Sequence, residues 1–98
     1  MVAESEIWTA LHAVIDPELE LDFVDLGLVY AVRIEGEDVH IDFTLTTPAC
    51  GIGPMVAEEM DEIVGALDGV RSVFPRLTFE PRWTPEKMSE DARFALGL

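Results

Sequence analysis

Residues 39–67, VHIDFTLTTPACGIGPMVAEEMDEIVGAL, hold a strand pattern, a turn-rich link and a helix pattern in direct succession. In the first part, four apolar residues alternate with polar ones, which is typical of a strand with one buried face: Val39, Ile41, Phe43 and Leu45. After the link, apolar residues recur at helical spacing at positions 56, 60, 63, 64 and 67. Proline suits a first helical position and glycine a C-terminal cap, so we expect a helix from Pro54 that is capped at Gly69.

The sequence before this stretch predicts a helix, a loop and a strand. Ser5 can cap a helix whose apolar residues recur through Val14, and Pro17 ends it because the residue before a proline disfavours the helical conformation. Residues 18–27 mix acids with apolar residues and are interpreted as an ordered loop. Residues 28–35 alternate like a strand, and the turn signal at 35–38 joins them to the strand at 39–46 as a hairpin.

The sequence after it predicts one more strand and one more helix. Residues 70–79 form a strand pattern that Pro75 interrupts, which indicates an edge strand or a bulge. Ser89 can cap a last short helix that runs through Leu96 and stops at Gly97. Trp83 and Met88 lie between them and should pack on the domain, because large apolar side chains gain by burial.

These elements define the fold class, an α+β sandwich in the order α-β-β-α-β-α. Helices cover one face of a small mixed sheet of about three strands, and the helix at 54–67 can serve as a right-handed crossover. With 98 residues, the chain is long enough for one small domain and too short for two cores. We therefore expect a single domain over 1–98, with residues 80–98 as a short C-terminal capping tail.

The charge of the chain restricts its partners. The net charge is −14, and residues 1–70 hold sixteen acids against the single base Arg33. Such a surface repels phosphates, so nucleic-acid binding is not expected. The acidity fits a solvated surface, a high-salt cytoplasm or a surface that steers a basic partner.

Composition also indicates the compartment. No apolar run approaches the ~20 residues that span a membrane, and the N-terminus lacks the pattern of a signal peptide. A single cysteine cannot form a disulfide within the chain. These features predict a cytoplasmic protein.

The single cysteine, Cys50, is the strongest candidate for chemistry. It lies in the link just before a helix, where unpaired backbone N–H groups favour the thiolate that binds metals or attacks electrophiles. The flanking glycines and prolines indicate a surface loop, and the glycines would let a ligand approach closely. The alternative is a small buried hydrophobic residue, as most free cysteines are.

Other polar residues have structural and functional interpretations. Asp16 and Glu18 flank Pro17 and fit turn chemistry as well as a binding site, while Asp25 fits a turn. Thr46 and Thr47 could end a strand, or their hydroxyls could bind a ligand or the thiolate. The histidines, His12 and His40, lack ligand spacing to Cys50, which favours structural or surface roles. The sequence contains no phosphate loop, Ser-His-Asp order or paired-cysteine zinc motif, so an enzyme is not expected.

Three segments together resemble the PaaD/SufT-like iron–sulfur cluster assembly family. They are Asp16-Pro17-Glu18 with VDLGLVY at 24–30, TLTTPAC at 44–50, and FEPRWTPEKMS at 79–89. They occur in order over nearly the whole chain. The family usually has proline directly after the cysteine, where this chain has Gly51, and the longer members that act in phenylacetate degradation have a cysteine-rich tail that is absent here.

The resemblance implies an accessory role in the maturation of iron–sulfur proteins. By likeness, one shallow site would contain Asp16, Glu18, Thr46, Thr47 and Cys50, with Cys50 as the metal ligand. The partners would be an iron–sulfur scaffold or apo-client proteins, and no tightly bound cofactor is expected. Since a cluster normally takes four thiolates, one chain, or a homodimer with two, could hold a cluster or iron only transiently. The alternatives are a cysteine-dependent redox protein or enzyme, and an interaction module in which Cys50 is structural.

Overall fold

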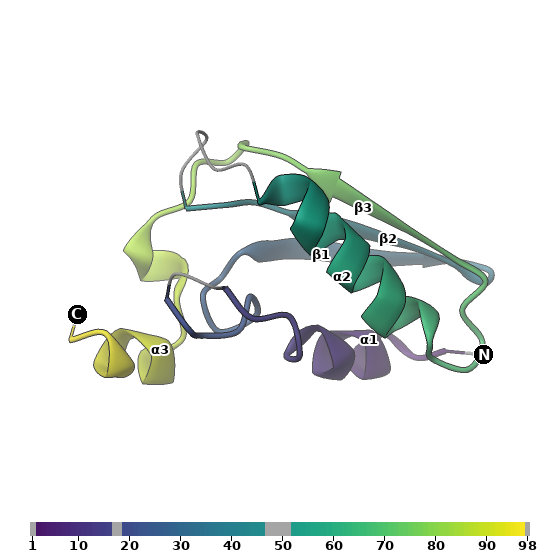
Figure 1. Cartoon of the computed structure of the whole chain (residues 1–98), viewed down its shortest axis with the longest axis horizontal. Coiled ribbons are helices and arrows are strands. Elements are labelled where there is room, and N and C mark those ends of the chain that lie inside the picture. The colour runs from purple at the N-terminus through teal and green to yellow at the C-terminus, as the bar shows by residue number, and fades with distance from the viewer. Residues whose placement is uncertain (1, 17–18, 47–51, 98) are drawn as a thin grey trace.

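The computed structural model describes residues 2–16, 19–46 and 52–97. The elements follow the predicted order, with one short 3₁₀ turn added before the last helix (Figure 1): α1 (Glu4–Leu11), β1 (Val29–Glu35), β2 (Asp38–Phe43), α2 (Gly53–Gly65), β3 (Ser72–Leu77), η1 (Pro85–Lys87) and α3 (Glu90–Ala95). Within the described residues, no helix is long and apolar enough to cross a membrane.

The sheet is mixed, as predicted, with the strand order β1-β2-β3. β1 and β2 form an antiparallel hairpin, whereas β3 runs parallel to β2 after the chain has crossed over through α2. Pro75 is compatible with this arrangement because β3 is an edge strand, where one row of backbone groups needs no ladder partner. In the central strand, Ile41 lies between Val32 of β1 and Pro75 of β3.

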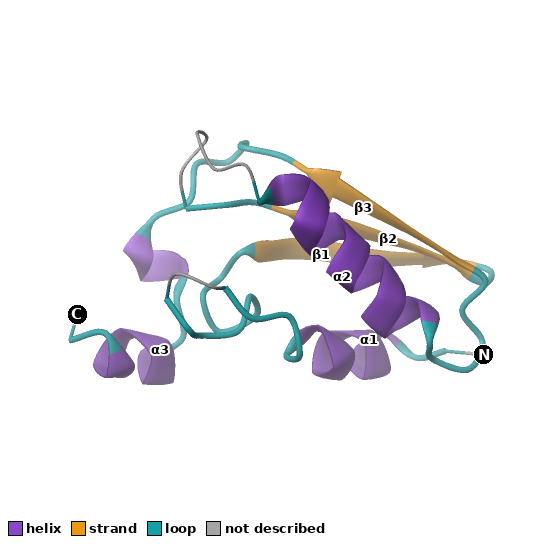
Figure 2. Ribbon diagram, in the orientation of Figure 1, coloured by secondary structure: helices purple, strands orange, loops and turns teal. Residues whose placement is uncertain are grey.

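The core lies between the sheet and two helices. α2 packs on β3, and α1 packs on both α2 and β1, so the two helices share one layer (Figure 2). The alternation in the central strand is confirmed, because Val39, Ile41, Phe43 and Leu45 are all buried. On α2, three residues of the predicted apolar stripe are buried as well: Val56, Met60 and Val64.

The C-terminal tail packs on the domain, as predicted. Met88 is buried, and the indole Nε1 of Trp83 donates a 2.8 Å hydrogen bond to the Leu26 carbonyl. The Tyr30 hydroxyl donates a 2.8 Å bond to the Pro81 carbonyl. Ser89 caps α3 through a 3.1 Å bond from the Ala92 amide, which confirms the cap expected there.

Several predicted boundaries were wrong at the helices. α1 begins at Glu4 with Ala3 as its N-cap, so Ser5 lies inside the first turn; the Glu6 carboxylate accepts the Ala3 amide at 3.0 Å. α1 also ends at Leu11, well before Pro17. The amides of residues 12–14 bond to carbonyls three residues earlier rather than four, and the Val14 carbonyl then accepts the amide of Phe23.

The other boundary differences follow from local turns. α2 ends at Gly65 with Ala66 as its cap, and Gly69 supplies a positive φ of 90° in the turn that follows. β2 ends at Phe43 and β3 covers only Ser72–Leu77, so both strands are shorter than their apolar patterns. A register shift between Val29 and Ala31 interrupts the alternation expected for β1.

Candidate functional site

A pocket lies beside the carboxyl ends of the two parallel strands. Its volume is about 260 Å³, and it is lined by Leu45, Thr46, Phe79, Glu80, Arg82 and Trp83. Two backbone hydrogen bonds hold the surrounding segments in place. The Thr44 amide donates to the Leu28 carbonyl at 2.8 Å, and the Thr78 amide donates to the Phe43 carbonyl at 2.9 Å.

The lining combines aromatic walls with a charged rim. Phe79 keeps 39 % of its surface exposed, while Trp83 is half-buried and fixed through its bond to Leu26. Arg82 is one of six basic residues in a chain with twenty acids, and Glu80 is the one acid among the described residues that line the pocket. An open site with an apolar wall and one cation can receive a side chain or short segment of a partner protein.

The structure describes two of the five predicted site residues, and these two lie in different environments. Thr46 lines the pocket, whereas Asp16 is buried in the turn after α1. Glu18, Thr47 and Cys50 lie outside the described residues. The shared site of all five therefore stays a prediction.

Asp16 organises the acidic loop. Its Oδ1 accepts the Leu19 amide at 3.0 Å, and its own amide donates to the Leu21 carbonyl at 2.9 Å. Its carbonyl also accepts the Glu20 amide at 2.8 Å. A carboxylate that is only 4 % exposed is costly unless it is hydrogen-bonded, and the Leu19 amide provides one such bond. These contacts agree with the turn chemistry expected for Asp16.

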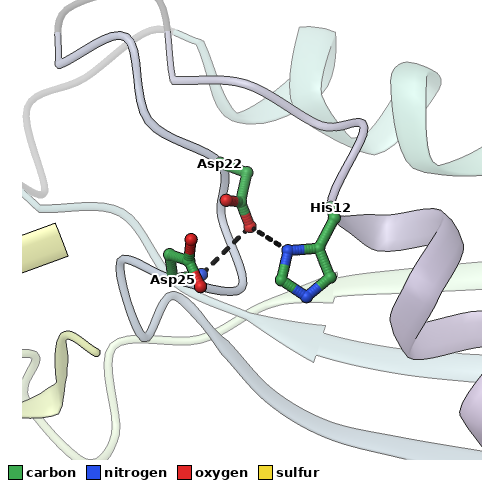
Figure 3. Close-up of side chains that lie close together, drawn as sticks. All are labelled: His12, Asp22 and Asp25. Carbon is green, nitrogen blue, oxygen red and sulfur yellow. Dashed lines mark hydrogen bonds and ion pairs between the residues drawn. The ribbon is translucent and has the colours of Figure 1, made fainter. Parts of the chain in front are cut away.

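A second cluster of side chains was not expected from the sequence. His12 Nδ1 lies 2.9 Å from Asp22 Oδ2, and this oxygen also accepts the Asp25 amide at 3.0 Å (Figure 3). Burial, and then the neighbouring Asp22, raise the pKa of the Asp25 carboxyl, while His12 opposes the shift. The spacing of Asp22 and Asp25 was visible in the sequence, but His12 joins them only because the chain reverses after α1.

The chain is a small α+β protein in which a cysteine-containing segment connects the central strand to the following helix. The chain matches the sequence model of the iron–sulfur cluster assembly protein family over residues 4–74. It belongs to this family.

Individual relatives span nearly the same length. The chain is 38% identical to the Fe-S protein maturation auxiliary factor YitW of Bacillus subtilis, over 97% of this chain and 94% of the relative. It is 37% identical to the Fe-S protein maturation auxiliary factor SufT of Staphylococcus aureus, over 87% and 98%. The fold is similar to the crystal structure of a domain of unknown function, DUF59, from Bacillus anthracis, with a TM-score of 0.90 and 33% identity over 97% of this chain and 92% of that one.

Proposed function

We propose that this chain is an accessory factor in iron–sulfur protein maturation that acts in the cytoplasm. The observation that carries the proposal is its end-to-end similarity to two proteins named as maturation auxiliary factors. The role is one of handling and adaptation rather than enzymatic turnover. Its partners are an iron–sulfur scaffold and apo-client proteins.

In this proposal Cys50 is the ligand that holds an iron ion or a cluster as cargo. A cluster is normally held by four thiolates, and this chain supplies one. The remaining ligands must therefore come from a partner protein, a small thiol or a second copy. The chain therefore holds the iron ion or cluster only briefly. The cargo moves to a client protein when that client offers a complete set of cysteine ligands.

The pocket at Thr46 supports the adaptor part of the role. Thr46 precedes Cys50 by four residues, so chain length alone keeps the Cα atoms of these two residues within about 14 Å of each other. A client segment seated against Phe79 and Trp83 would thus lie near the cargo. Arg82 would favour an acidic group on that segment, because opposite charges that meet across an interface attract each other.

Anaerobic reconstitution and transfer test the proposal. The wild type should take up iron and sulfide with a visible absorption band and speed the activation of an apo-client. Cys50→Ser should lose both properties and keep its circular dichroism spectrum. If Cys50→Ser unfolds, the cysteine is structural. If it binds no cargo but still supports maturation, the protein is an adaptor alone.

A matched pair of variants tests the pocket. Arg82→Gln removes a pocket cation, and Arg93→Gln removes an exposed cation from α3, so the two proteins have the same net charge. We expect Arg82→Gln to slow client activation at least about threefold and Arg93→Gln to leave it unchanged. Equal rates of client activation for the two variants would show that the pocket is not part of the client interface.

A further inference from the structure

The side chains of His12, Asp22 and Asp25 converge outside the pocket (Figure 3). His12 is the C-cap residue of α1, and the two aspartates belong to the turns that precede β1. Their backbones are fixed by an isolated β-bridge between Ile15 and Asp22 and by the 2.9 Å bond from the Phe23 amide to the Val14 carbonyl. The tertiary structure therefore brings the three side chains together.

The distances approach those of a metal centre. One ligand atom from each of the three residues lies within 4.8 Å of the other two. In the tetrahedral geometry usual for zinc, bonds of about 2.0–2.2 Å place two ligand atoms about 3.3–3.6 Å apart, so the three side chains would have to close by about 1 Å. Because backbone amides hold the Asp22 carboxylate, rotation of the His12 and Asp25 side chains would bring the three residues onto a common ion.

The surroundings of these three side chains suit a cation that can exchange with the solvent. The Asp22 side chain is 13% exposed, and its Oδ2 accepts the amides of Val24 and Asp25 at 3.1 and 3.0 Å, which fixes this carboxylate. The His12 side chain is 48% exposed, so water can complete the coordination. Two carboxylates this close repel each other in a chain of net charge −14, and a dication would remove that repulsion.

We propose that His12, Asp22 and Asp25 form a binding site for one exchangeable divalent transition-metal ion of the zinc or ferrous-iron class. The imidazole disfavours calcium and magnesium, which prefer oxygen ligands. Three protein ligands leave positions open to water, unlike the closed four-ligand sites of structural zinc. This site is separate in composition from Cys50 and does not depend on the proposed function.

Zinc titration of the full chain in the Cys50→Ser background tests the site, because it removes the thiol as a competing ligand. We expect saturable binding of one ion, with a shift of the His12 imidazole resonances in the NMR spectrum. His12→Gln should weaken binding at least about tenfold. Zinc at saturation should also raise the melting temperature, because an ion that binds the folded state stabilises it.

His40→Gln is the matched control. His40 also faces a carboxylate, Glu35, at 3.9 Å, but belongs to none of the metal-ligating clusters found in the described residues. It should leave zinc affinity unchanged within about twofold. If His12→Gln fails to fold, Asp25→Asn takes its place as the test variant. It should weaken zinc binding by the same factor of about ten. Absence of saturable binding in the Cys50→Ser protein, or equal effects of His12→Gln and His40→Gln, would overturn the proposal.

Discussion

Substitution of Gly27 by alanine should detach the C-terminal tail from the domain. Gly27 has a φ of +72°, and an added Cβ would meet the backbone carbonyl group of Lys87, with the carbonyl carbon at 2.6 Å. The tail would have to move at the point where Met88 is buried. Gly36 is the matched control, since its φ is +64° but nothing lies within 4 Å of an added Cβ.

The magnitude follows from two contributions. Positive φ costs alanine roughly 1–2 kcal/mol, and the less flexible unfolded chain returns roughly 0.4–1 kcal/mol, so Gly36→Ala should lose about 0–1.6 kcal/mol. Gly27→Ala adds the loss of Met88 packing, for which methionine-to-alanine changes of about 2–5 kcal/mol are the guide. The two variants should therefore differ by at least about 2 kcal/mol.

Thermal unfolding followed by circular dichroism measures this difference. In a domain of this size, 2 kcal/mol corresponds to a gap of at least about 8 °C in melting temperature. Fluorescence should also report increased solvent exposure of Trp83 in the Gly27→Ala protein. Equal melting temperatures for the two variants would refute the reasoning, because they would show that the contact between Gly27 and Lys87 does not hold the tail.

Three further substitutions test local features of the fold. Ser89→Ala removes the oxygen that accepts the Ala92 amide and should cost about 0.5–2 kcal/mol in urea unfolding, whereas Ser5→Ala should change stability by less than about 0.5 kcal/mol because Ser5 is not the N-cap of α1. In metal-free protein, Asp25→Asn should raise the melting temperature at pH 7, since the raised pKa of Asp25 means that its ionised form destabilises the folded state. The gain should shrink as the pH falls through the pKa of Asp25 toward the unfolded value, and a gain independent of pH would contradict this assignment.

The sequence by itself determined the type and order of the main elements. Alternation at Val39, Ile41 and Phe43 and the stripe at Val56 and Met60 are local periodicities, and each was confirmed by burial. The sequence also indicated that β3 is an edge strand or contains a bulge, because proline is poorly tolerated in the middle of a sheet, and the structure shows the edge strand. Similarity of motifs, rather than periodicity, indicated the family.

The turn after α1 and the position of Trp83 depended on contacts outside the local pattern. After α1 ends, the Val14 carbonyl accepts the amide of Phe23. The sequence also predicted burial of Trp83, but its partner, the Leu26 carbonyl, lies 57 residues away. No local pattern encodes such a pair.

In the candidate sites, too, the sequence predicted some features and the tertiary structure decided others. The motifs selected Thr46 as a site residue, while only the folded chain shows that it shares a pocket with Phe79 and Trp83. The sequence favoured a structural or surface role for His12, and only the chain reversal after α1 places it beside Asp22. Periodicity acts over a few residues and is written in the sequence, whereas chain reversals that join distant side chains are decided by packing of the whole domain.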